Sequence, residues 1–461
     1  MSRYQNTINT NISWIPQIPN HWNLMKVNAL FQERKCKVSD KVFSPLSVTK
    51  KGILPQLEHA AKTNNGDNRK FVKAGDFVIN SRSDRKSSCG VSQLDGSVSL
   101  INIVLTPREE LNGKYIHYLL RNYRFSEEYY RNGRGIVADL WTTRYSEMKS
   151  ILIPVPPRTE QDQIVRFLDW KVSEINKLIT LKRKKIKELK SLKLCHITEV
   201  VTRGLNYKIK NKSSASKWIG TVPQHWDIVS IRRAYTVILG KMLSPDKATK
   251  SDRLEEYICA KDVHFDGVSL CDLKKMWFSY NEREQYRVFD GDLMVVEGGA
   301  GAGNAAVVMN INEKRVYVQN SVHIIRAKDG KAINEYLYFW LFSLVKRGYM
   351  ESVCSVATIP HYTKDKVLAT IMPLPPLLEQ KKIVTYLRDY SAKIDALILN
   401  IESSIKDMKE LQSSLISDVV TGKIDVRNVE IPEYEHIDDM VDDGDGEENE
   451  EELADAEETE A

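Results

Sequence analysis

Hydrophobic positions with helical spacing fill two long stretches of the chain. In residues 377–421 they recur every three or four positions, at Ile383, Leu387, Tyr390, Ile394, Leu397, Ile401, Ile405, Met408, Leu411, Leu415 and Val419. In residues 160–203 they recur at Ile164, Leu168, Val172, Ile175, Ile179, Ile186, Leu189, Leu192 and Val200, with Lys182 interrupting the stripe. This spacing predicts two helices of about 44 residues and about 65 Å that pack on each other along a coiled-coil seam.

The segments before each helix have a different pattern. Short β-branched runs bounded by Gly, Asp and Asn predict strands in residues 1–157 and 207–376. Each segment also contains one amphipathic helical stretch, at 113–130 and 333–350. Pro156-Pro157 and Pro375-Pro376 separate these segments from the long helices, because proline is poorly tolerated inside a helix. We therefore predict α+β domains at 1–157 and 207–376, and helical spacers at 158–206 and 377–425.

An internal duplication explains why these parts occur twice. Five blocks return in the same order, with an offset that drifts only from 204 to 221. The first copies are WIPQIPNHWNLMKVNALF, VKAGDFVI, YIHYLL, IPVPPRTEQDQIVRFL and ITEVVTRGLN, which begin at 14, 72, 115, 153 and 197. The second copies begin at 218, 288, 336, 372 and 416. The chain is therefore a tandem repeat of a unit of about 200 residues.

The formal net charge of +5 combines two unlike parts. Residues 430–461 contain 17 acidic residues and no Lys or Arg, which leaves 67 basic against 45 acidic residues in 1–429. A body of +22 favours an anionic partner, and nucleic acid is the first candidate. Residues 426–461 form an acidic tail that we expect to be disordered. We hypothesise that it competes with DNA for the basic face, and a purely solubilising tail is the alternative.

Composition excludes several other classes. No stretch approaches the roughly 18 apolar residues of a membrane span, and the first residues have no apolar signal-peptide core. The six cysteines are scattered without CxxC or zinc spacing, so reduced thiols and a cytoplasmic location are expected. The sequence also lacks the N-P-P-Y or D-P-P-Y, P-loop and H-E-x-x-H motifs. Three cofactor chemistries therefore lack their characteristic residues.

The repeated motifs resemble those of the specificity (S) subunit of type I restriction–modification systems. Four doubled motifs carry the resemblance, which covers about residues 14–425. They are W-I-x-x-(I/V)-P-x-H-W at 14–22 and 218–226, G-D-(F/L)-(V/M) at Gly75 and Gly291, P-(V/L)-P-P-x-x-E-Q-x-x-I-V at 154–165 and 373–384, and V-V-T at 200–202 and 419–421. The acidic tail lies outside this family pattern.

The resemblance implies a DNA-reading subunit that neither cuts nor methylates. Each target-recognition domain would read one half of a bipartite, asymmetric target in double-stranded DNA. The helices would lie antiparallel and set the half-site spacing. Two methyltransferase (M) subunits would dock on this scaffold and restriction (R) subunits could join them. The complex would use S-adenosylmethionine, ATP and Mg²⁺ through those other subunits, with no cofactor or metal bound by this chain.

Candidate DNA-binding residues lie in basic, polar segments. Arg and Lys can bond guanine edges or phosphates, and Asn can bond adenine. In the first domain the candidates are Lys50, Lys51, Arg69, Arg82, Arg85, Lys86, Arg134 and Arg144, from segments that include 64–70, 81–88 and 133–144. In the second they are Lys241, Lys247, Lys250, Asn304, His361 and Lys364, from 239–250, 297–304 and 359–366. Solvated charged loops are the alternative interpretation of each segment.

Other motifs have weaker interpretations. Gly301 to Ala306 fits a loose G-x-G-x-x-A fingerprint, but the following residues predict a strand and not the required helix. Asp246, Asp272 and Lys274 imitate a metal-nuclease spacing in one copy only, which leaves a single-chain nuclease as an alternative. A second alternative is an assembly scaffold that reads no bases. The His-Trp pairs at 21–22 and 225–226 are interpreted as packing residues.

Overall fold

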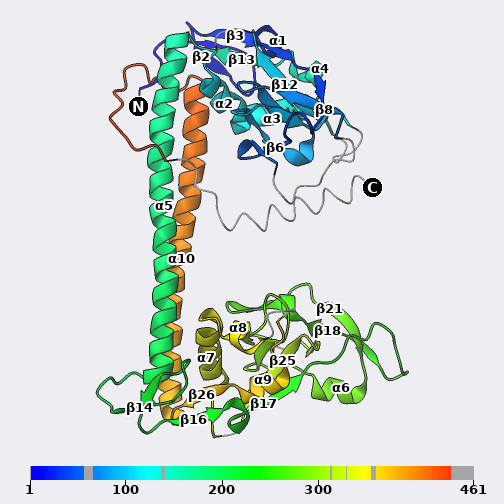
Figure 1. Cartoon of the computed structure of the whole chain (residues 1–461), viewed down its shortest axis with the longest axis vertical. Coiled ribbons are helices and arrows are strands. Elements are labelled where there is room, and N and C mark those ends of the chain that lie inside the picture. The colour runs from blue at the N-terminus through cyan, green and yellow to red at the C-terminus, as the bar shows by residue number, and fades with distance from the viewer. Residues whose placement is uncertain are drawn as a thin grey trace. The chain divides into compact units, whose positions relative to one another are not determined.

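The computed structural model describes residues 2–56, 66–108, 111–135, 141–311, 314–328, 330–354 and 360–437. They divide into two compact units, one formed by 1–184 with 402–461 and the other by 185–401. Each unit contains one mixed domain of strands and short helices together with parts of both long helices (Figure 1). The mixed content confirms the predicted α+β class.

A four-stranded antiparallel sheet has the same order in both units. In the first unit the order is β10-β9-β12-β4, with bounds Cys89–Val91, Phe77–Asn80, Asn102–Pro107 and Phe31–Glu33. In the second it is β23-β22-β25-β17, with bounds Ala305–Val307, Leu293–Val296, Val322–Ala327 and Tyr235–Leu239. The G-D motif precedes β9 and β22, so the duplicated sequence builds the same central sheet twice.

Two small strand pairs also repeat. β1 (Thr7–Asn9) pairs with β2 (Gln17–Pro19), as β14 (Asn211–Ser213) pairs with β15 (Thr221–Pro223). β3 (Asn23–Lys26) pairs with β13 (Leu152–Val155), as β16 (Asp227–Ser230) pairs with β26 (Ile371–Leu374). Because β13 and β26 lead into the long helices, the second pair joins each domain's first segment to the start of a long helix.

The three-stranded sheets differ between the units. The first is β11-β8-β5, from Gly96–Val98, Arg69–Val72 and Lys37–Val38, and it is antiparallel throughout. The second is β21-β18-β24, from Lys274–Phe278, Arg253–Ile258 and Val316–Val318, with β24 parallel to β18. Hairpins β6-β7 (Leu46–Thr49, Gly52–Pro55) and β19-β20 (Val263–His264, Gly267–Val268) complete the strands. The two copies thus diverge outside the repeated framework.

The predicted single helix at 113–130 is two helices. α2 (Gly113–Arg121) ends at Asn122, whose side-chain oxygen accepts hydrogen bonds from the first turn of α3 (Tyr123–Arg131). The second copy is likewise divided into α7 (Asn334–Lys346) and α8 (Tyr349–Val353) at Gly348, which has φ +82°. The other short helices are α1 (Val27–Leu30), α4 (Tyr145–Met148), α6 (Tyr280–Gln285) and α9 (Lys364–Ala369), with single turns at Ser83–Arg85, Ile231–Arg233 and Ala260–Asp262.

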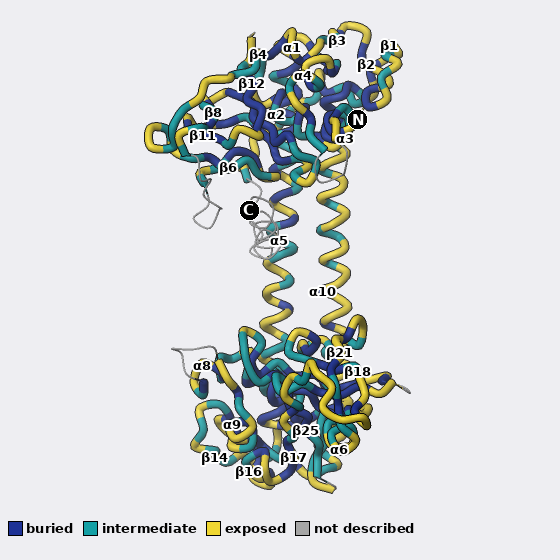
Figure 2. The backbone as a smooth tube through the Cα atoms, turned by 90° about the vertical axis from the view of Figure 1, so that its right-hand side faces the viewer, coloured by how far each residue is buried: buried dark blue, intermediate teal, exposed yellow. Residues whose placement is uncertain are grey.

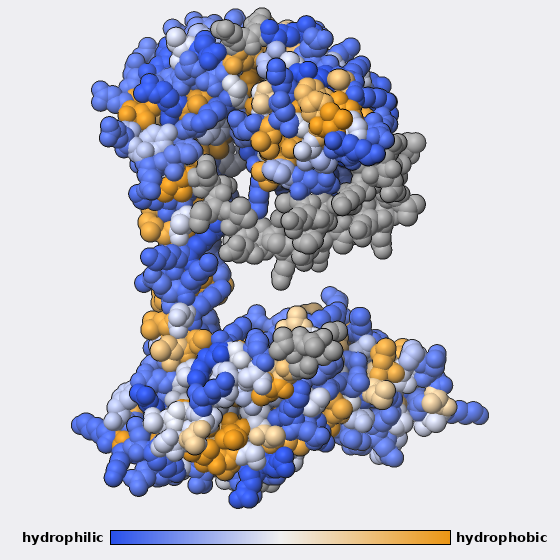
Figure 3. Space-filling view, viewed as in Figure 1, coloured by the Kyte–Doolittle hydropathy of each residue, from blue (hydrophilic) through white to orange (hydrophobic). Residues whose placement is uncertain are grey.

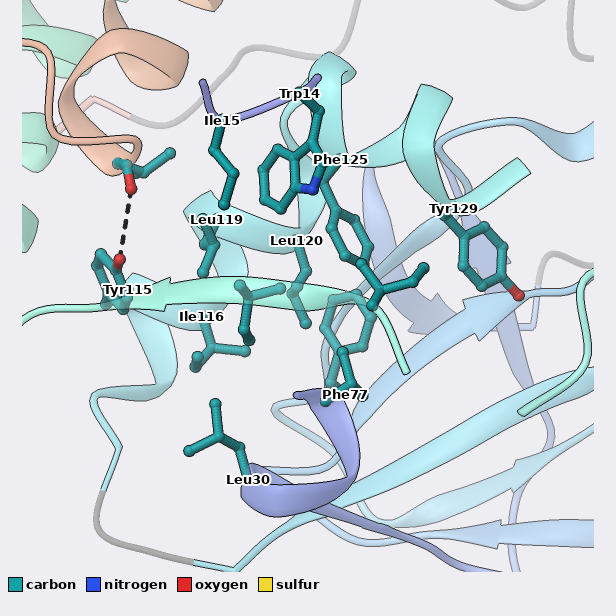
Figure 4. Close-up of a cluster of buried hydrophobic side chains, with 14 of the residues drawn as sticks. Trp14, Ile15, Leu30, Phe77, Tyr115, Ile116, Leu119, Leu120, Phe125 and Tyr129 are labelled. Carbon is teal, nitrogen blue, oxygen red and sulfur yellow. Dashed lines mark hydrogen bonds between the residues drawn. The ribbon is translucent and has the colours of Figure 1, made fainter. Parts of the chain in front are cut away.

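Each mixed domain has its own hydrophobic core. In the first, Trp14 and Phe125 pack edge to face beside Phe77 and Leu120 (Figure 4). In the second, Trp226 and Trp340 are fully buried in the equivalent cluster. Figure 2 shows buried positions concentrated in the mixed domains, whereas exposed positions predominate along the long helices. Burial of Trp22 and Trp226 confirms the packing interpretation of these residues.

The long helices are α5 (Arg158–Arg203) and α10 (Leu377–Val420). In the second unit Leu189 packs against Ile394 and Ile398, and Lys193 Nζ lies 2.7 Å from Asp395. His196 lies 2.9 Å from the hydroxyl of Tyr386, so the partners run in opposite directions there. In the first unit Gln412 donates to Asn176 at 3.0 Å. Hydrophobic side chains also remain exposed on these helices, among them Leu178, Leu181, Leu397 and Leu411 (Figure 3).

The Glu-Gln pair of the repeated P-P-x-x-E-Q motif joins each helix to its mixed domain. Glu160 Oε1 accepts hydrogen bonds from the Tyr4 hydroxyl at 2.5 Å and Trp22 Nε1 at 3.1 Å, and Oε2 lies 2.8 Å from His21 Nε2. Glu379 accepts from His225 and Trp226, each at 2.9 Å. The first and third motifs of the repeat are therefore two halves of one contact.

The glutamines secure the same junction by a second route. Gln161 donates to the Pro156 carbonyl at 3.0 Å and accepts from the backbone N–H of Asn112, also at 3.0 Å. Gln380 repeats both bonds, with the Pro375 carbonyl at 2.8 Å and the Ile333 N–H at 3.1 Å. Both glutamines are buried, so their satisfied amides hold the loop before α2 or α7 against the helix start.

Each mixed domain also holds the end of the other long helix. Tyr115 donates its hydroxyl hydrogen bond to the Pro154 carbonyl at 3.1 Å and reaches the Val420 carbonyl of α10 at 3.4 Å (Figure 4). In the second unit Tyr336 donates to the Val201 carbonyl of α5 at 3.0 Å. The V-V-T motifs are thus buried helix ends.

The start of the predicted disordered tail is ordered. Gln163 Nε2 donates to the carbonyls of Val426 and Val429 at 3.1 and 2.9 Å, and Asn176 Nδ2 donates to that of Ile437 at 3.1 Å. Val426 is fully buried in the first core. The tail prediction is therefore wrong for 426–437, because apolar side chains and backbone carbonyls in this segment find partners on α5. Residues 438–461 lie outside the described residues.

We predict that Glu160→Gln lowers the free energy of unfolding of the first unit by about 2 kcal/mol, because a buried carboxylate that accepts three donors is replaced by an amide. Glu379→Gln is the matched control and should cost less, since Glu379 accepts two donors and is more exposed. Denaturant unfolding of the full chain measures both. Equal or negligible losses would contradict the assigned role of Glu160.

Candidate nucleic-acid interface

In the first unit three predicted segments meet beyond the end of β9. Thr142 forms β-bridges with both Arg82 and Arg134. The Thr143 N–H donates to the Ser81 carbonyl at 2.9 Å, and the Ser83 N–H donates to the Trp141 carbonyl at 3.1 Å. The structure therefore brings the 81–88 loop beside the ends of the 133–144 segment. Residues 64–65, 136–140 and 359 of the predicted segments lie outside the described residues.

Basic side chains of these loops differ in how firmly they are held. The Arg134 side chain is 86% exposed, and its Nε lies 3.9 Å from Glu147. Lys86 Nζ lies 3.1 Å from Glu127 and 5.9 Å from the centre of the Tyr130 ring. Arg85 lies 3.8 Å from its neighbour Asp84. Such solvated ion pairs are weak, so these cations remain able to exchange partners for an anionic ligand.

Arg144 lies next to these loops, where its backbone caps a short helix. Its backbone N–H donates to the Glu147 carboxylate at 3.0 Å at the start of α4. Gly133 permits the close approach of this segment, because a Cβ there would lie 2.5 Å from Trp141 Nε1. This close approach lets Trp141 Nε1 donate to the Tyr130 carbonyl at 2.8 Å.

Lys50 and Lys51 form the turn of the β6-β7 hairpin. Arg121 of α2 hydrogen-bonds the Lys50 carbonyl and lies 2.8 Å from His117 Nε2. Burial, with a smaller contribution from Arg121, lowers the pKa of His117 to about 3, so the ring is neutral. The hairpin turn is thereby held on α2.

Arg69, predicted to bind DNA, is instead buried in the first mixed domain. Arg69 is 5% exposed, and its guanidinium donates to the Ser97 hydroxyl at 2.9 Å and the Ser97 carbonyl at 3.0 Å. Burial also lowers the pKa of this guanidinium. Arg69 therefore pairs β8 with β11 and is not available to a duplex.

A hollow of about 780 Å³ adjoins the first group of loops. Ser83 and Lys86 line one part of it, and Tyr123, Arg124 and Trp141 line another. Tyr123 is 49% exposed, and the Arg124 guanidinium lies 5.6 Å from the centre of its ring. Sequence reasoning missed Tyr123 and Arg124 because they sit inside an expected helix. The sequence offers only an aromatic residue directly followed by arginine as a signal, and the exposure of Tyr123 emerges only in the fold.

The second unit uses the equivalent backbone positions with different side chains. Gly298 forms a β-bridge with His361, as Arg82 does with Thr142. The Tyr362 N–H donates to the Glu297 carbonyl at 2.6 Å, as Thr143 does to Ser81. The 297–304 loop and the 360–364 segment are thus brought together after β22. His361 and Lys364 are exposed and Asn304 is half-buried.

The remaining second-domain candidates form another group. The predicted DNA-binding role of Lys241 is wrong for the same reason as that of Arg69. Its Nζ donates to the Trp277 carbonyl at 2.8 Å and lies 2.6 Å from Glu282. Lys247 lies 5.2 Å from the centre of the Trp277 ring, and Lys250 is exposed in the same loop. Lys247 and Lys250 remain candidates, whereas Lys241 supports the loop from within.

The alternative motifs receive little structural support. Gly301 to Ala306 leads into β23, so no helix follows to receive a phosphate. Asp272 is exposed with φ +50°, and Lys274 lies on β21. No cluster of three or more His, Cys, Asp or Glu side chains that could hold a metal ion occurs among the described residues. Within that same part of the chain no helix is long and apolar enough to cross a membrane.

Comparison with known proteins shows similarity to one family. The model of the type I restriction modification DNA specificity domain matches residues 277–407. A Methanocaldococcus jannaschii protein assigned as the type I restriction enzyme MjaX specificity subunit is 23% identical over 328 residues, which are 70% of this chain and 71% of that protein. The MjaVIII specificity subunit of the same organism is 24% identical over 291 residues, which are 61% of this chain and 64% of that protein.

The fold has a solved counterpart. A chain solved in work on complex assembly and conformational transition of the type I R–M system aligns with a TM-score of 0.63 and 16% identity, over 88% of this chain and 99% of that one. These matches agree with the doubled motifs that carried the resemblance, which is confirmed. The chain is thus similar, over most of its length, to the specificity subunits of type I restriction–modification enzymes.

Proposed function

We propose that this chain reads a bipartite, asymmetric sequence in double-stranded DNA, one half with each mixed domain. The observation that carries the proposal is the repeated loop construction. Equivalent strands β9 and β22 end in loops bridged to equivalent segments, yet one site presents Arg82, Lys86 and Arg134 and the other Gly298, Asn304 and His361. A common framework with different side chains suits two readers of different bases.

The helices serve as a spacer in this proposal. Each mixed domain holds the start of one long helix and the end of the other, and α5 and α10 contact each other within each unit. We infer that they form one antiparallel coiled coil that sets the gap between half-sites. Their exposed leucines offer apolar surface to partner proteins, in keeping with docking of two methyltransferase subunits.

The chemistry belongs to other subunits in this proposal. Methyltransferase subunits would bring S-adenosylmethionine, and restriction subunits would bring ATP and Mg²⁺-dependent cleavage. This chain would contribute recognition without catalysis. Mg²⁺-dependent DNA cutting by the purified chain alone would instead support the nuclease alternative built on Asp246, Asp272 and Lys274.

We predict that Asn304→Ala with His361→Ala changes the methylated motif in one half only. Arg82→Ala with Lys86→Ala should change only the other half, because each pair lies in a different mixed domain. Mapping methylated positions in DNA from cells that express the chain with its methyltransferase subunits provides the measurement. Loss of methylation at every site without a changed motif would favour the non-reading scaffold.

Arg134→Ala should weaken duplex binding for all sequences alike and reduce the slope of log affinity against log salt by about one, as expected for one phosphate contact. Its matched control is Arg69→Ala, which should lower stability because it removes buried bonds to Ser97. Binding titrations at several salt concentrations and denaturant unfolding separate the two effects. An unchanged salt slope for Arg134→Ala would remove this residue from the interface.

Inserting seven residues into both α5 and α10, after Lys184 and Ile401, should widen the gap between half-sites by about three base pairs. Seven residues add about 10.5 Å of helix, against about 3.4 Å per base pair. Inserting them into α5 alone is the control and should destabilise the chain, because the paired seams lose register. Methylation mapping should find unchanged bases. A changed base with an unchanged gap would contradict the spacer role.

A further inference from the structure

Residues 426–437, here called the C-terminal strap, lie along α5 in the first unit. The chain turns after α10, where Gly422 has φ +77°, and Asp425 then pairs with Ser2. Val426 is buried, and Val429 and Ile431 pack on the same core. The strap is therefore anchored at its beginning by apolar burial.

The strap runs in the same direction as α5. Its first carbonyls accept from Gln163, and His436 then lies 3.3 Å from the Ser173 hydroxyl. At the far end the Ile437 carbonyl accepts from Asn176. The strap therefore follows α5 over the 13 residues from Gln163 to Asn176, and hydrogen bonds hold both of its ends.

The end of the strap already pairs with a cation of α5. The Glu435 carboxylate lies 3.3 Å from Lys177 Nζ, and both side chains are more than half exposed. Lys182, Arg183 and Lys184 follow within the same unit, and Lys184 is exposed. We call Lys177 together with 182–184 the basic stretch of α5.

The chain beyond the strap has the complementary charge. Residues 438–461 contain 14 acidic residues and no Lys or Arg, and the first two are Asp438 and Asp439. Residues 182–184 lie about 9–12 Å along the helix from Asn176, at 1.5 Å per residue. Three or four extended residues span that distance, so Asp442 and Asp443, the next carboxylates after Asp439, can reach these cations without a long loop.

We propose that the acidic segment 438–461 docks on the basic stretch of α5 and competes there with anionic ligands. Tethering by the strap gives the segment a high effective concentration at this face. Attraction between many charges within a Debye length favours the contact at low salt and weakens it at high salt. Its competition with a duplex rests on the proposed function, whereas the docking itself does not.

Zero-length carbodiimide cross-linking of the full chain tests the docking directly. Cross-links should join carboxylates of 438–461 to Lys182 and Lys184, and they should diminish at about 0.5 M salt because screening weakens the contact. Lys26 and Lys149 are exposed lysines of the same unit and serve as internal controls. Equal cross-linking to the controls, or none to Lys182 and Lys184, would overturn the proposal.

A binding measurement tests the competition. Two variants are compared with the full chain, one lacking 438–461 and one in which its acids are replaced by Asn and Gln at unchanged length. Both should bind a nonspecific duplex roughly three- to tenfold more tightly at low salt. The gain should vanish when Lys182, Arg183 and Lys184 are also changed to Gln.

An equal gain in that triple-Gln background would mean that the acidic segment acts elsewhere, which overturns docking on α5. Cross-linking needs no DNA, so it decides the docking even if the chain were to bind no duplex. A chain that shows the cross-links but binds no duplex would count against the proposed function alone.

Discussion

The hydrogen bonds that Glu160 and Glu379 accept from the His-Trp pairs are the contact on which the rest of the architecture depends. The loops that follow β9 and β22 have a defined position relative to the long helices only if the domain that carries them cannot rotate on the helix. An indole and an imidazole that converge on one carboxylate restrict that rotation, and the adjacent glutamine binds a second loop. Charge-assisted bonds at a helix start also suit the helix dipole. This explains why two motifs that lie 138–139 residues apart in the first copy and 153–154 in the second recur together.

The start of the chain also pairs with the segment that follows the last helix, although the two are far apart in sequence. Asn206 follows the first V-V-T motif and leads into the second mixed domain, so its counterpart after the second V-V-T motif is Asp425. Counting by the offset of the first repeated block, its counterpart at the chain start is Ser2. Ser2 and Asp425 form a β-bridge, with the Asp425 N–H donating to the Ser2 carbonyl at 3.0 Å. In the second unit, the end of α5 is joined covalently to the mixed domain through Asn206. In the first unit, the β-bridge between Ser2 and Asp425 makes the equivalent connection between the end of α10 and the mixed domain.

The fold class and the family resemblance could be predicted from sequence because the doubled motifs lie in the packed framework, where residue identity is tightly constrained. The failures concern contacts made at long range. Nothing local distinguishes buried Arg69 from exposed Arg134, since the partner that buries Arg69 is Ser97 on another strand. Lys241 was misjudged for the same reason, because Trp277 and Glu282 satisfy it. The strap was missed because composition averages an apolar, hydrogen-bonding beginning with the acidic residues that follow.

The division between constant and variable parts constrains what each side chain can do. The central sheet keeps its order in both units, whereas the three-stranded sheets differ in strand pairing and direction. Divergence is therefore found away from the Glu-Gln contacts, in the three-stranded sheets. The loops that follow β9 and β22 differ as well, in the side chains that they carry. A change in those loops alters what the domain presents without loosening its hold on the helix. Conversely, a change at Glu160 would disturb the placement of every loop in its domain at once, so the side chains that the loops present and the placement of those loops are separable at the level of single residues.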